Sequence, residues 1–264
     1  MGDNLRKYSK IWWMLSLRAA KVSLNSRFGA VLFIVAKLVR FFLFLLFILV
    51  LETKVQTVSG YSLWQMIFFF ATFNIVDVLG QLFLREVYRF RQYVISGDFD
   101  YFLLKPFSPL FRSLFGGGDV LDIPILLLSV LFLFIATMHI GNVTLGGVLL
   151  YLVLLGNAFL IALAFHILVL SLCIVTTEID NALWVYRDLT QLGRFPVDIY
   201  HEPLRGILTF IVPIGIMMTF PAKALMGVLS AEVILFSCGV GTGLVLVALI
   251  TWHYALRSYT SASS

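Results

Sequence analysis

Charged side chains are scarce in this sequence. Asp, Glu, Lys and Arg together make up 12% of the 264 residues, whereas soluble domains carry roughly 25%. A run of 55 residues between Asp122 and Glu178 contains none of the four. A bilayer core about 30 Å thick needs roughly 20 helical residues, so this run is long enough for two crossings and a turn. The scarcity excludes a soluble fold and predicts an all-α integral membrane protein.

The sequence also lacks the patterns expected for catalysis and for nucleotide or metal binding. It has no G-x-x-x-x-G-K-[ST] loop for ATP, and its four histidines do not have the spacing of a metal site. Cys173 and Cys238 both lie in apolar runs, which indicates packing and not a disulfide. No nucleophile, base and orienting group fall together. We therefore expect that this chain is not an enzyme and binds no metal or cofactor.

Acidic side chains are outnumbered by basic ones, and the net charge is +5. In a membrane protein such an excess marks the cytoplasmic flanks of the spans, so nucleic acid is a poor explanation for it.

Residues 1–27 hold six basic residues against Asp3 alone. Apolar side chains recur there every three or four positions, with Lys and Arg on another face. This pattern predicts an amphipathic helix that lies in the cytoplasmic headgroup plane.

Long apolar runs predict most of the membrane crossings. The basic residues of 85–118 place this loop in the cytoplasm, and the short loops 52–60 and 141–145 are then outside. The apolar runs are found at about 28–51, 61–84, 120–140, 145–176 and 231–256.

The region between the fourth and last of these runs is ambiguous. The last run is followed by Arg257, which indicates a cytoplasmic end, so an odd number of crossings must precede it. Residues 179–196 could cross as a polar helix covered by protein, with 203–225 dipping into the outer leaflet and returning. Alternatively, 204–221 crosses as an apolar helix kinked by prolines. The residues alone leave both topologies open.

Polar side chains inside the second run share one helical face. Asn74, Asp77 and Gln81 lie at positions i, i+3 and i+7. A carboxylate at this depth is costly and usually faces protein or water. The group either lines a pathway or holds a helix pair together, and both interpretations are open.

Two further features fall inside the predicted spans. Lys37 and Arg40 belong to the first span, where they either snorkel to the headgroups or face a pathway or partner. Gly239 and Gly243 form a G-x-x-x-G pattern in the last span. This pattern predicts close helix packing.

The cytoplasmic loop contains a compact polar segment, ISGDFDYFLLKPFSPLFR, at residues 95–112. Such a segment is typical of a short helix that lies outside the membrane and presents charged and aromatic side chains to a soluble partner. Gly97 would break its helix and Pro106 would redirect the chain toward the bilayer. The alternative is a solvated loop that binds no partner.

The whole organisation resembles the permease subunits of bacterial type-two ABC exporters, over essentially the full chain. Two motifs carry the resemblance, GDFDYFLLKP at 97–106 and GRFPVDIY followed by FPAKAL, beginning at Gly193. The resemblance implies six spans, with 179–196 as an unusually charged fifth span and 203–225 as an outer re-entrant element. It also implies both termini in the cytoplasm and a location in the bacterial inner membrane.

The resemblance further implies partners. Residues 85–106 would hold a coupling helix that docks on a separate cytoplasmic ATPase, present in two copies, which would bind ATP and magnesium. A second permease, identical or a sister subunit, would face this one across the path of the cargo. The cargo would be an amphiphile, lipid, glycan, peptide or drug. The rival function is an ATP-independent scaffold or secondary carrier, although six spans are few for a carrier and no inverted repeat is visible.

These implications assign candidate residues to three groups. The coupling residues are Arg85, Arg89, Arg91, Gly97, Asp98, Phe99, Asp100, Tyr101, Leu104, Lys105 and Pro106. The translocation path or permease interface would use Asn74, Asp77, Gln81, Arg187, Asp188 and Arg194. The outer element would use Phe195, Pro196, Asp198, Phe220 and Pro221.

Overall fold

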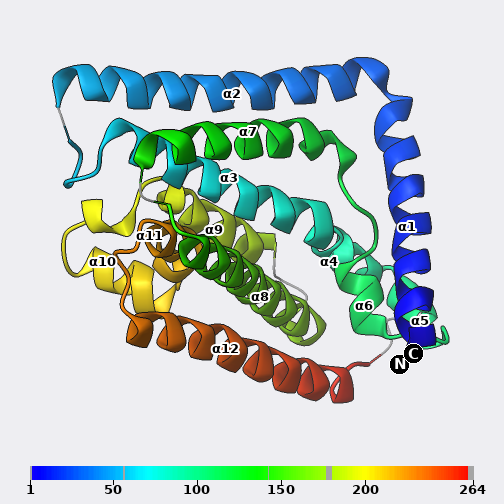
Figure 1. Cartoon of the computed structure of the whole chain (residues 1–264). Helices are drawn as coiled ribbons and strands as arrows, with labels where there is room; N and C mark the ends of the chain where they lie inside the picture. Colours follow the sequence, from blue (N-terminus) through cyan, green and yellow to red (C-terminus); the bar gives the residue numbers. More distant parts are fainter. Residues whose placement is uncertain (1, 56, 142, 177–179, 261–264) are drawn as a thin grey trace.

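Helices account for the architecture of the chain (Figure 1). The computed structural model describes residues 2–55, 57–141, 143–176 and 180–260. In these residues no β-strand occurs, apart from one isolated bridge between Val58 and Tyr61. The α-helices are α1 (Gly2–Asn25), α2 (Arg27–Lys54), α3 (Leu63–Leu84), α4 (Val87–Ile95), α5 (Asp98–Leu103), α6 (Pro109–Leu114), α7 (Ile123–Ile140), α8 (Leu145–Thr176), α9 (Asp180–Gln191), α10 (Leu204–Gly206), α11 (Phe220–Leu225) and α12 (Ala231–Arg257). The predicted all-α class is confirmed.

In the part of the chain that the structure describes, five helices are long and apolar enough to cross a membrane. They are α2, α3 with α4 (Leu63–Ile95), α7 with its preceding turn (Val120–Ile140), α8 and α12. A sixth crossing results only if Leu204–Ile211 and Gly215–Leu225, which meet at 78°, are counted as one span. The five helices overlap the five apolar runs of the sequence, although Leu63–Ile95 extends past the run at 61–84 into the predicted loop 85–118. The chain is therefore a multi-pass membrane protein.

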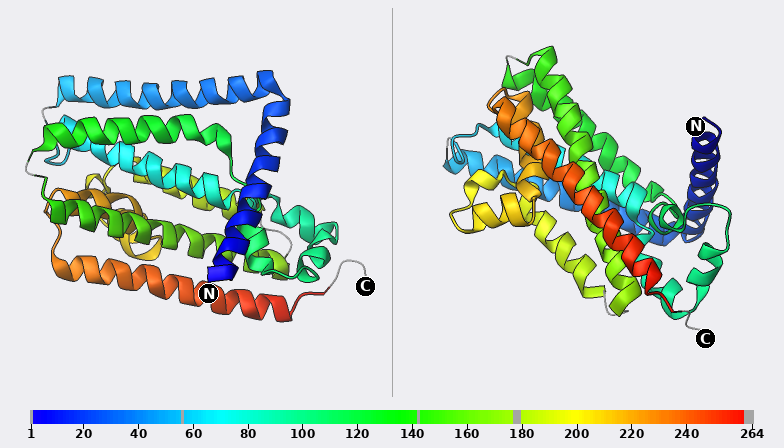
Figure 2. Two further views of the ribbon diagram at one scale, coloured as in Figure 1. Left: turned by 45° about the vertical axis from the view of Figure 1, so that its right-hand side comes forward. Right: turned by 90° about the horizontal axis from the view of Figure 1, so that it is seen from below.

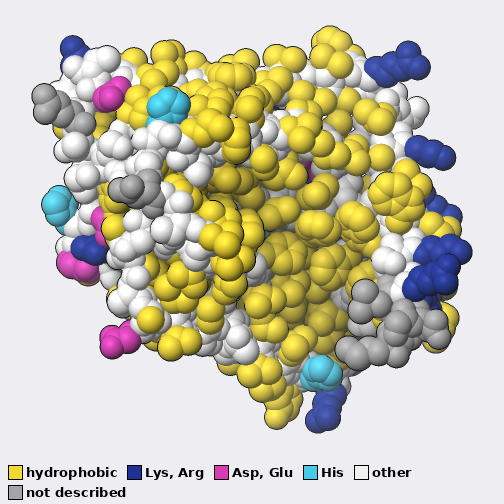
Figure 3. Space-filling view, in the orientation of Figure 1, with side chains coloured by type: hydrophobic (Ala, Val, Ile, Leu, Met, Phe, Trp, Pro, Cys, Tyr) yellow, Lys and Arg dark blue, Asp and Glu magenta, His cyan; other side chains and the backbone are white. Residues whose placement is uncertain are grey.

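The two ends of the bundle differ in what they carry. In Figure 1, α1, the group α4–α6 and the last turn of α12 lie at one end, and the α10–α11 region lies at the other. On the face drawn in Figure 3, most Lys and Arg side chains gather at the end that holds α1, and most Asp and Glu side chains at the opposite end. Between them the surface is almost entirely apolar, as a lipid-facing belt requires.

The chain turns sharply between α1 and α2, and α1 lies across the end of the bundle (Figures 1 and 2). Its inner face packs on the chain, since the Trp12 ring stacks on Phe83 at 5.3 Å and the Gly118 amide donates a 3.0 Å hydrogen bond to Ser16. Trp13, by contrast, is 59% exposed. Residues 2–25 of the predicted segment 1–27 are thus helical, and the position of this helix in the headgroup plane stays a prediction.

The core of the bundle is built around α8, which packs against α12, α3 and α11. Asn157 of α8 donates a 2.9 Å hydrogen bond to the Ser237 carbonyl of α12. A Cβ at Gly241 would lie 2.0 Å from the Asn157 side chain. The G-x-x-x-G prediction was wrong in its details, because Cβ atoms at Gly239 and Gly243 would meet nothing within 4 Å. The glycine between them makes the close approach.

Candidate functional site

Helix α9 (Asp180–Gln191) and the turn after it contribute Arg187 and Arg194 to a cavity between the helices. A 3-10 turn (Leu192–Arg194) continues α9, and the chain then enters the α10–α11 region, which we call the outer element after its predicted position. Gly193 is buried there, and a Cβ on it would lie 2.7 Å from Met218 and 2.9 Å from Ile214. The hydroxyl of Tyr200 donates a 2.8 Å hydrogen bond back to the Leu192 carbonyl. The end of α9 is thus fixed against the bent segment Leu204–Leu225.

A polar cavity lies between α2, α3, the start of α7 and α9. The sequence predicted that Asn74, Asp77 and Gln81 share a face, and the structure places all three in its wall. Arg187 and Arg194 also line it, whereas Asp188 is exposed and does not. The polar wall consists of Lys37, Arg40, Asn74, Asp77, Gln81, Asp122, Arg187 and Arg194.

Several of these polar groups have partners within the chain. Lys37 forms an ion pair with Asp122. The Asn74 amide donates to the Phe70 carbonyl at 2.7 Å. Arg194 donates to the Gln191 side chain. A cavity wall of this composition is costly inside a bilayer, which makes a functional role the default interpretation.

Asp77 is the carboxylate at the centre of this charge arrangement. The basic groups that act on it electrostatically are Arg40, Arg187, Lys37 and Arg194, in decreasing order. Among the residues that the structure describes, Asp77 forms no direct ion pair with any of them. Asp77 thus shares the cavity wall with Arg40, Arg187 and Arg194, while the fourth basic residue, Lys37, is paired with Asp122.

The polar loop at the α1 end folds into three short helices. Gly97 has a φ of 77°, which favours glycine because other residues rarely adopt it, and it separates α4 from α5. Phe99 of α5 is fully buried, with its ring centroid 5.0 Å from Phe90 and 5.1 Å from Tyr259. Phe99 thus belongs to the chain's own core and does not face a partner, in contrast to the predicted contact. It connects the loop to the end of α12.

Other coupling candidates are on the surface. Tyr101 and Leu104 are 64% and 81% exposed. Asp98, Lys105 and Pro106 are exposed as well. We call these five exposed side chains the loop surface.

Asp100 is held by the tail of α12. The Tyr259 hydroxyl donates to it at 3.0 Å. Burial and this hydrogen bond raise the pKa of Tyr259 to about 12. The α1 helix holds the same loop from the other side, since Lys7 donates to the Pro106 carbonyl at 2.7 Å and the Ser108 amide donates to Tyr8 at 3.2 Å.

The three coupling arginines differ in their surroundings. Arg85 is ion-paired with Asp119, which is buried. Arg89 is 60% exposed and lies 3.7 Å from Glu86. Arg91 is half-buried. Much of this positive charge therefore helps to fold the loop, and Arg89 is the arginine that a partner can reach most easily.

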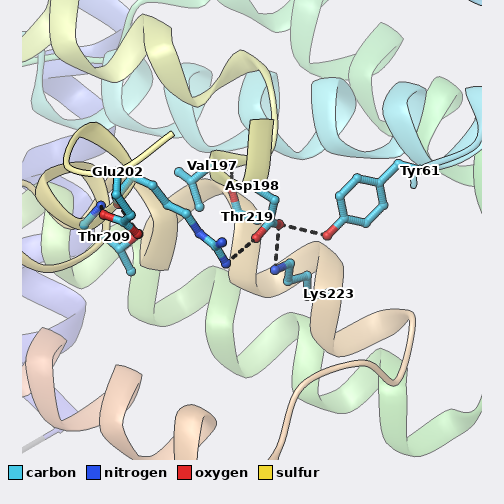
Figure 4. Close-up of polar contacts among 9 residues, drawn as sticks. Tyr61, Val197, Asp198, Glu202, Thr209, Thr219 and Lys223 are labelled. Carbon is cyan, nitrogen blue, oxygen red and sulfur yellow. Dashed lines mark hydrogen bonds and ion pairs between the residues drawn. The ribbon is translucent and has the colours of Figure 1, made fainter. Parts of the chain in front are cut away.

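The outer element is organised around Asp198 (Figure 4). Its carboxylate accepts hydrogen bonds from Tyr61 at 2.8 Å, from Lys223 at 2.6 Å and from Arg205 at 2.9 Å. Burial acts to raise the pKa of Asp198, but the hydrogen bonds from Lys223 and Tyr61 and the charges of Lys223 and Arg205 outweigh it. The pKa is held below its ordinary value of 3.8.

The remaining predicted outer residues pack around this centre. Phe195 reaches α2, with its ring 5.2 Å from Phe44. Pro196 and Pro221 are buried, and Phe220 is partly buried. The sequence reasoning missed Tyr61, Arg205 and Lys223. Only Lys223 gave a signal, as a single lysine within the apolar FPAKAL segment.

Comparison with known proteins decides the family. The model of a family described as "ABC-2 family transporter protein" matches residues 38–263. The chain belongs to the ABC-2 transporter family. No curated protein and no solved structure matches it. As a member of this family the chain is a type-2 ABC transporter permease, the membrane component of the transporter, and permeases of this kind associate with an ABC ATPase subunit.

The residues matched by the family model include two of the three sites in full, the loop surface and the outer element. The polar cavity, the loop surface and the outer element all lie within residues 38–263, except that Lys37 precedes the match. Helix α1 also lies outside it. The contacts of α1 with the loop are therefore features of this chain that the family match does not describe.

Proposed function

We propose that this permease is part of an exporter in the bacterial inner membrane, driven by a separate cytoplasmic ATPase. In this arrangement the loop 85–118 and both termini are cytoplasmic. The distribution of basic side chains supports this orientation, because they gather at the end that carries these segments (Figure 3). Two ATPase copies and a second permease, identical or a sister subunit, complete the transporter.

The observation that carries the proposal is the construction of the loop. Its exposed side is the loop surface, with Tyr101 and Leu104, which suits a protein partner because it combines an aromatic and a large apolar side chain. Its buried side is anchored to α12 through Phe99 and Tyr259. A displacement of the loop by ATP-driven closure of the ATPases is therefore passed to α12, and from α12 to α8.

The fifth crossing in this proposal is α9 with the turn that follows it. The cavity supports this choice, since it lies between α9 and the membrane-length helices α2 and α3. The bent segment Leu204–Leu225 is then the outer re-entrant element. A cysteine replacing Tyr200 should react with an impermeant reagent from outside sealed cells, whereas a cysteine replacing Ser108 should not. The reverse pattern would reject this topology.

The second permease has a suitable surface to contact. An apolar groove of about 730 Å³ runs between α8, α9 and α12. Leu172, Val185 and Tyr254 on its walls are about half exposed or more. We assign it to the contact between permeases, beside which the cargo moves outward. The cargo classes compatible with this arrangement are amphiphiles, lipids, glycans, peptides and drugs.

Purification from the native host tests the function. The tagged chain should retain a protein that carries a phosphate-binding loop, and the complex should hydrolyse ATP. Intact chain that retains no such protein and no ATP hydrolysis, in a detergent that preserves its fold, would reject the proposal in favour of an ATP-independent role.

A further inference from the structure

The polar cavity lies deep within the membrane-length helices. Lys37 and Arg40 lie 10 and 13 residues after the start of α2 at Arg27, which is about 15 Å and 20 Å along the helix axis. Asp77 is seven residues before the end of α3, or about 10 Å from it. Arg40 is therefore near the middle of α2, at a depth where ionised side chains are rare unless they serve a pathway.

Positive charge exceeds negative charge around this cavity. Four basic residues line it, against the two carboxylates of Asp77 and Asp122. The pair between Lys37 and Asp122 is internally balanced. Arg40, Arg187 and Arg194 then share Asp77 as the remaining carboxylate of the wall. A network that serves only to hold helices together would be expected to balance its charges, since an uncompensated buried charge is strongly destabilising.

The free donors are guanidinium groups. Among the residues described, neither Arg40 nor Arg187 forms an ion pair with a carboxylate. Arginine presents a planar fork of N–H donors that matches carboxylate and phosphate oxygens, and it is always charged. Arg40 of α2 and Arg187 of α9 line one cavity together with Arg194 of the following 3-10 turn, which also donates to Gln191.

Aromatic rings complete the wall. Phe41, Phe44 and Phe70 line the cavity beside the arginines, and the Arg194 guanidinium lies 5.4 Å from the centre of the Phe44 ring. The site thus offers anion-binding donors and an adjacent apolar surface. Molecules with an anionic head and an apolar body match both features.

We propose that this cavity binds the anionic group, phosphate or carboxylate, of an amphiphilic cargo. Arg40, Arg187 and Arg194 are the donors, and the phenyl rings contact the apolar part next to the charge. The assignment rests on the permease function proposed above and narrows its cargo to anionic amphiphiles. The enclosed space is about 20 Å³, enough for a single water-sized group, so one anionic oxygen enters and the rest of the head stays beside exposed Arg40.

Asp77 has a defined role in this site. Its negative charge opposes that of the cargo and offsets part of the attraction of the three arginines. A transport site must bind strongly enough to load and weakly enough to release, as in ion pathways. Removal of the Asp77 charge should therefore tighten binding, which is the opposite of the effect of removing an arginine.

The test measures binding by the permease alone, without an ATPase. The chain is placed in nanodiscs of phosphatidylcholine that contain traces of a photoactivatable phosphatidic acid or of a matched photoactivatable phosphatidylcholine. Labelled peptides from α2, α3 and α9 are quantified by mass spectrometry. The variants are R40Q/R187Q, R40K/R187K, D77N and, as a control for loss of an exposed arginine, R257Q.

The expected result has a direction for each variant. In the wild type, phosphatidic acid labels these helices about tenfold more than phosphatidylcholine does, and R40Q/R187Q abolishes the preference. R40K/R187K retains most of it because the charge is kept, D77N increases it, and R257Q leaves it unchanged. Equal labelling by the two probes in the wild type, or a preference that persists in R40Q/R187Q, would overturn the proposal. If R40Q/R187Q does not fold, a decrease of the preference in D77N would overturn it equally.

A competition arm identifies the source of the anion. Millimolar inorganic phosphate should not displace the phosphatidic acid probe, because it lacks the apolar part that the phenyl rings contact. Displacement would support an anion site but overturn the amphiphile as its occupant. Failure of the permease function would be seen separately, as the absence of an ATPase from the purified complex.

Discussion

The Tyr61 hydroxyl donates a 2.8 Å hydrogen bond to the carboxylate of Asp198, 137 residues later in the chain. This contact connects the loop between α2 and α3 to the outer element. Because Lys223 and Arg205 bind the same carboxylate, Asp198 holds three segments together at the end of the bundle opposite α1.

Removal of Asp198 should cost more than removal of any one of its partners. D198A leaves Lys223 and Arg205 without their shared anion, and a partly buried lysine without a partner is destabilising by about 3 kcal/mol. Y61F removes one hydrogen bond, which costs about 1 kcal/mol. Thermal unfolding in nanodiscs should rank D198A below Y61F, with Y101F, at an exposed tyrosine of the loop surface, close to the wild type. Equal midpoints for D198A and Y101F would show that the cluster does not stabilise the fold.

The same carboxylate predicts a dependence on pH. The pKa of Asp198 in the folded chain is below its ordinary value of 3.8. Its contribution to stability is therefore complete above the unfolded pKa and is lost as the pH falls through the folded pKa. When the pH is lowered from about 5 to below about 4, the unfolding midpoint of the wild type should fall more steeply than that of D198N. Parallel curves for the two proteins would contradict the assignment.

Phe99 and the loop surface should respond differently to truncation. F99A creates a cavity in the core and should cost about 3–5 kcal/mol of stability. Y101A/L104A removes exposed side chains and should change stability by less than about 0.5 kcal/mol. The double variant should nevertheless weaken binding of the ATPase about tenfold or more, because large apolar and aromatic side chains dominate interfaces. Unchanged ATPase binding by a stable Y101A/L104A would exclude this surface from the interface.

Gly117 should be necessary for the docking of α1. Its φ is 153°, and a Cβ there would lie 2.9 Å from the Ala19 side chain and 3.2 Å from the Leu15 carbonyl oxygen. G117A should therefore push α1 away from the loop and increase its cleavage by protease. G156A, inside α8 where a Cβ meets nothing within 4 Å, is the matched control. Equal protection of α1 in both variants would contradict the close packing.

The local patterns of the sequence predicted the elements that depend on hydropathy and periodicity. The run without charges became α7 and α8, and the three- and four-residue repeat became α1. The common face of Asn74, Asp77 and Gln81 followed from helix geometry alone. These features depend on neighbours within a few turns, so the sequence is sufficient to show them.

The sites depend on contacts between distant segments, which local patterns do not report. The residues near Asp77 do not indicate that Arg187 and Arg194 line the same cavity, and only the family resemblance grouped them with it. Tyr61 and Asp198 are far apart in sequence, and their pairing follows from the path of the whole chain. Hydropathy also reports only how apolar a segment is, and not which element a side chain contacts. It therefore could not show that Phe99 is turned into the core while Tyr101 faces out. Nor could it show that Gly241, and not Gly239 or Gly243, contacts α8.

Site-specific photo-crosslinking in the native host tests the central claim most directly. A photoreactive amino acid replaces Tyr101 on the loop surface or, as a control, Phe210, which is 67% exposed in the outer element. After irradiation, the crosslinked proteins are identified by mass spectrometry. We predict that position 101 captures an ATP-binding subunit with a phosphate-binding loop and that position 210 does not. Failure of position 101 to capture any such subunit, or equal capture from position 210, would contradict an ATPase-driven permease coupled through this loop.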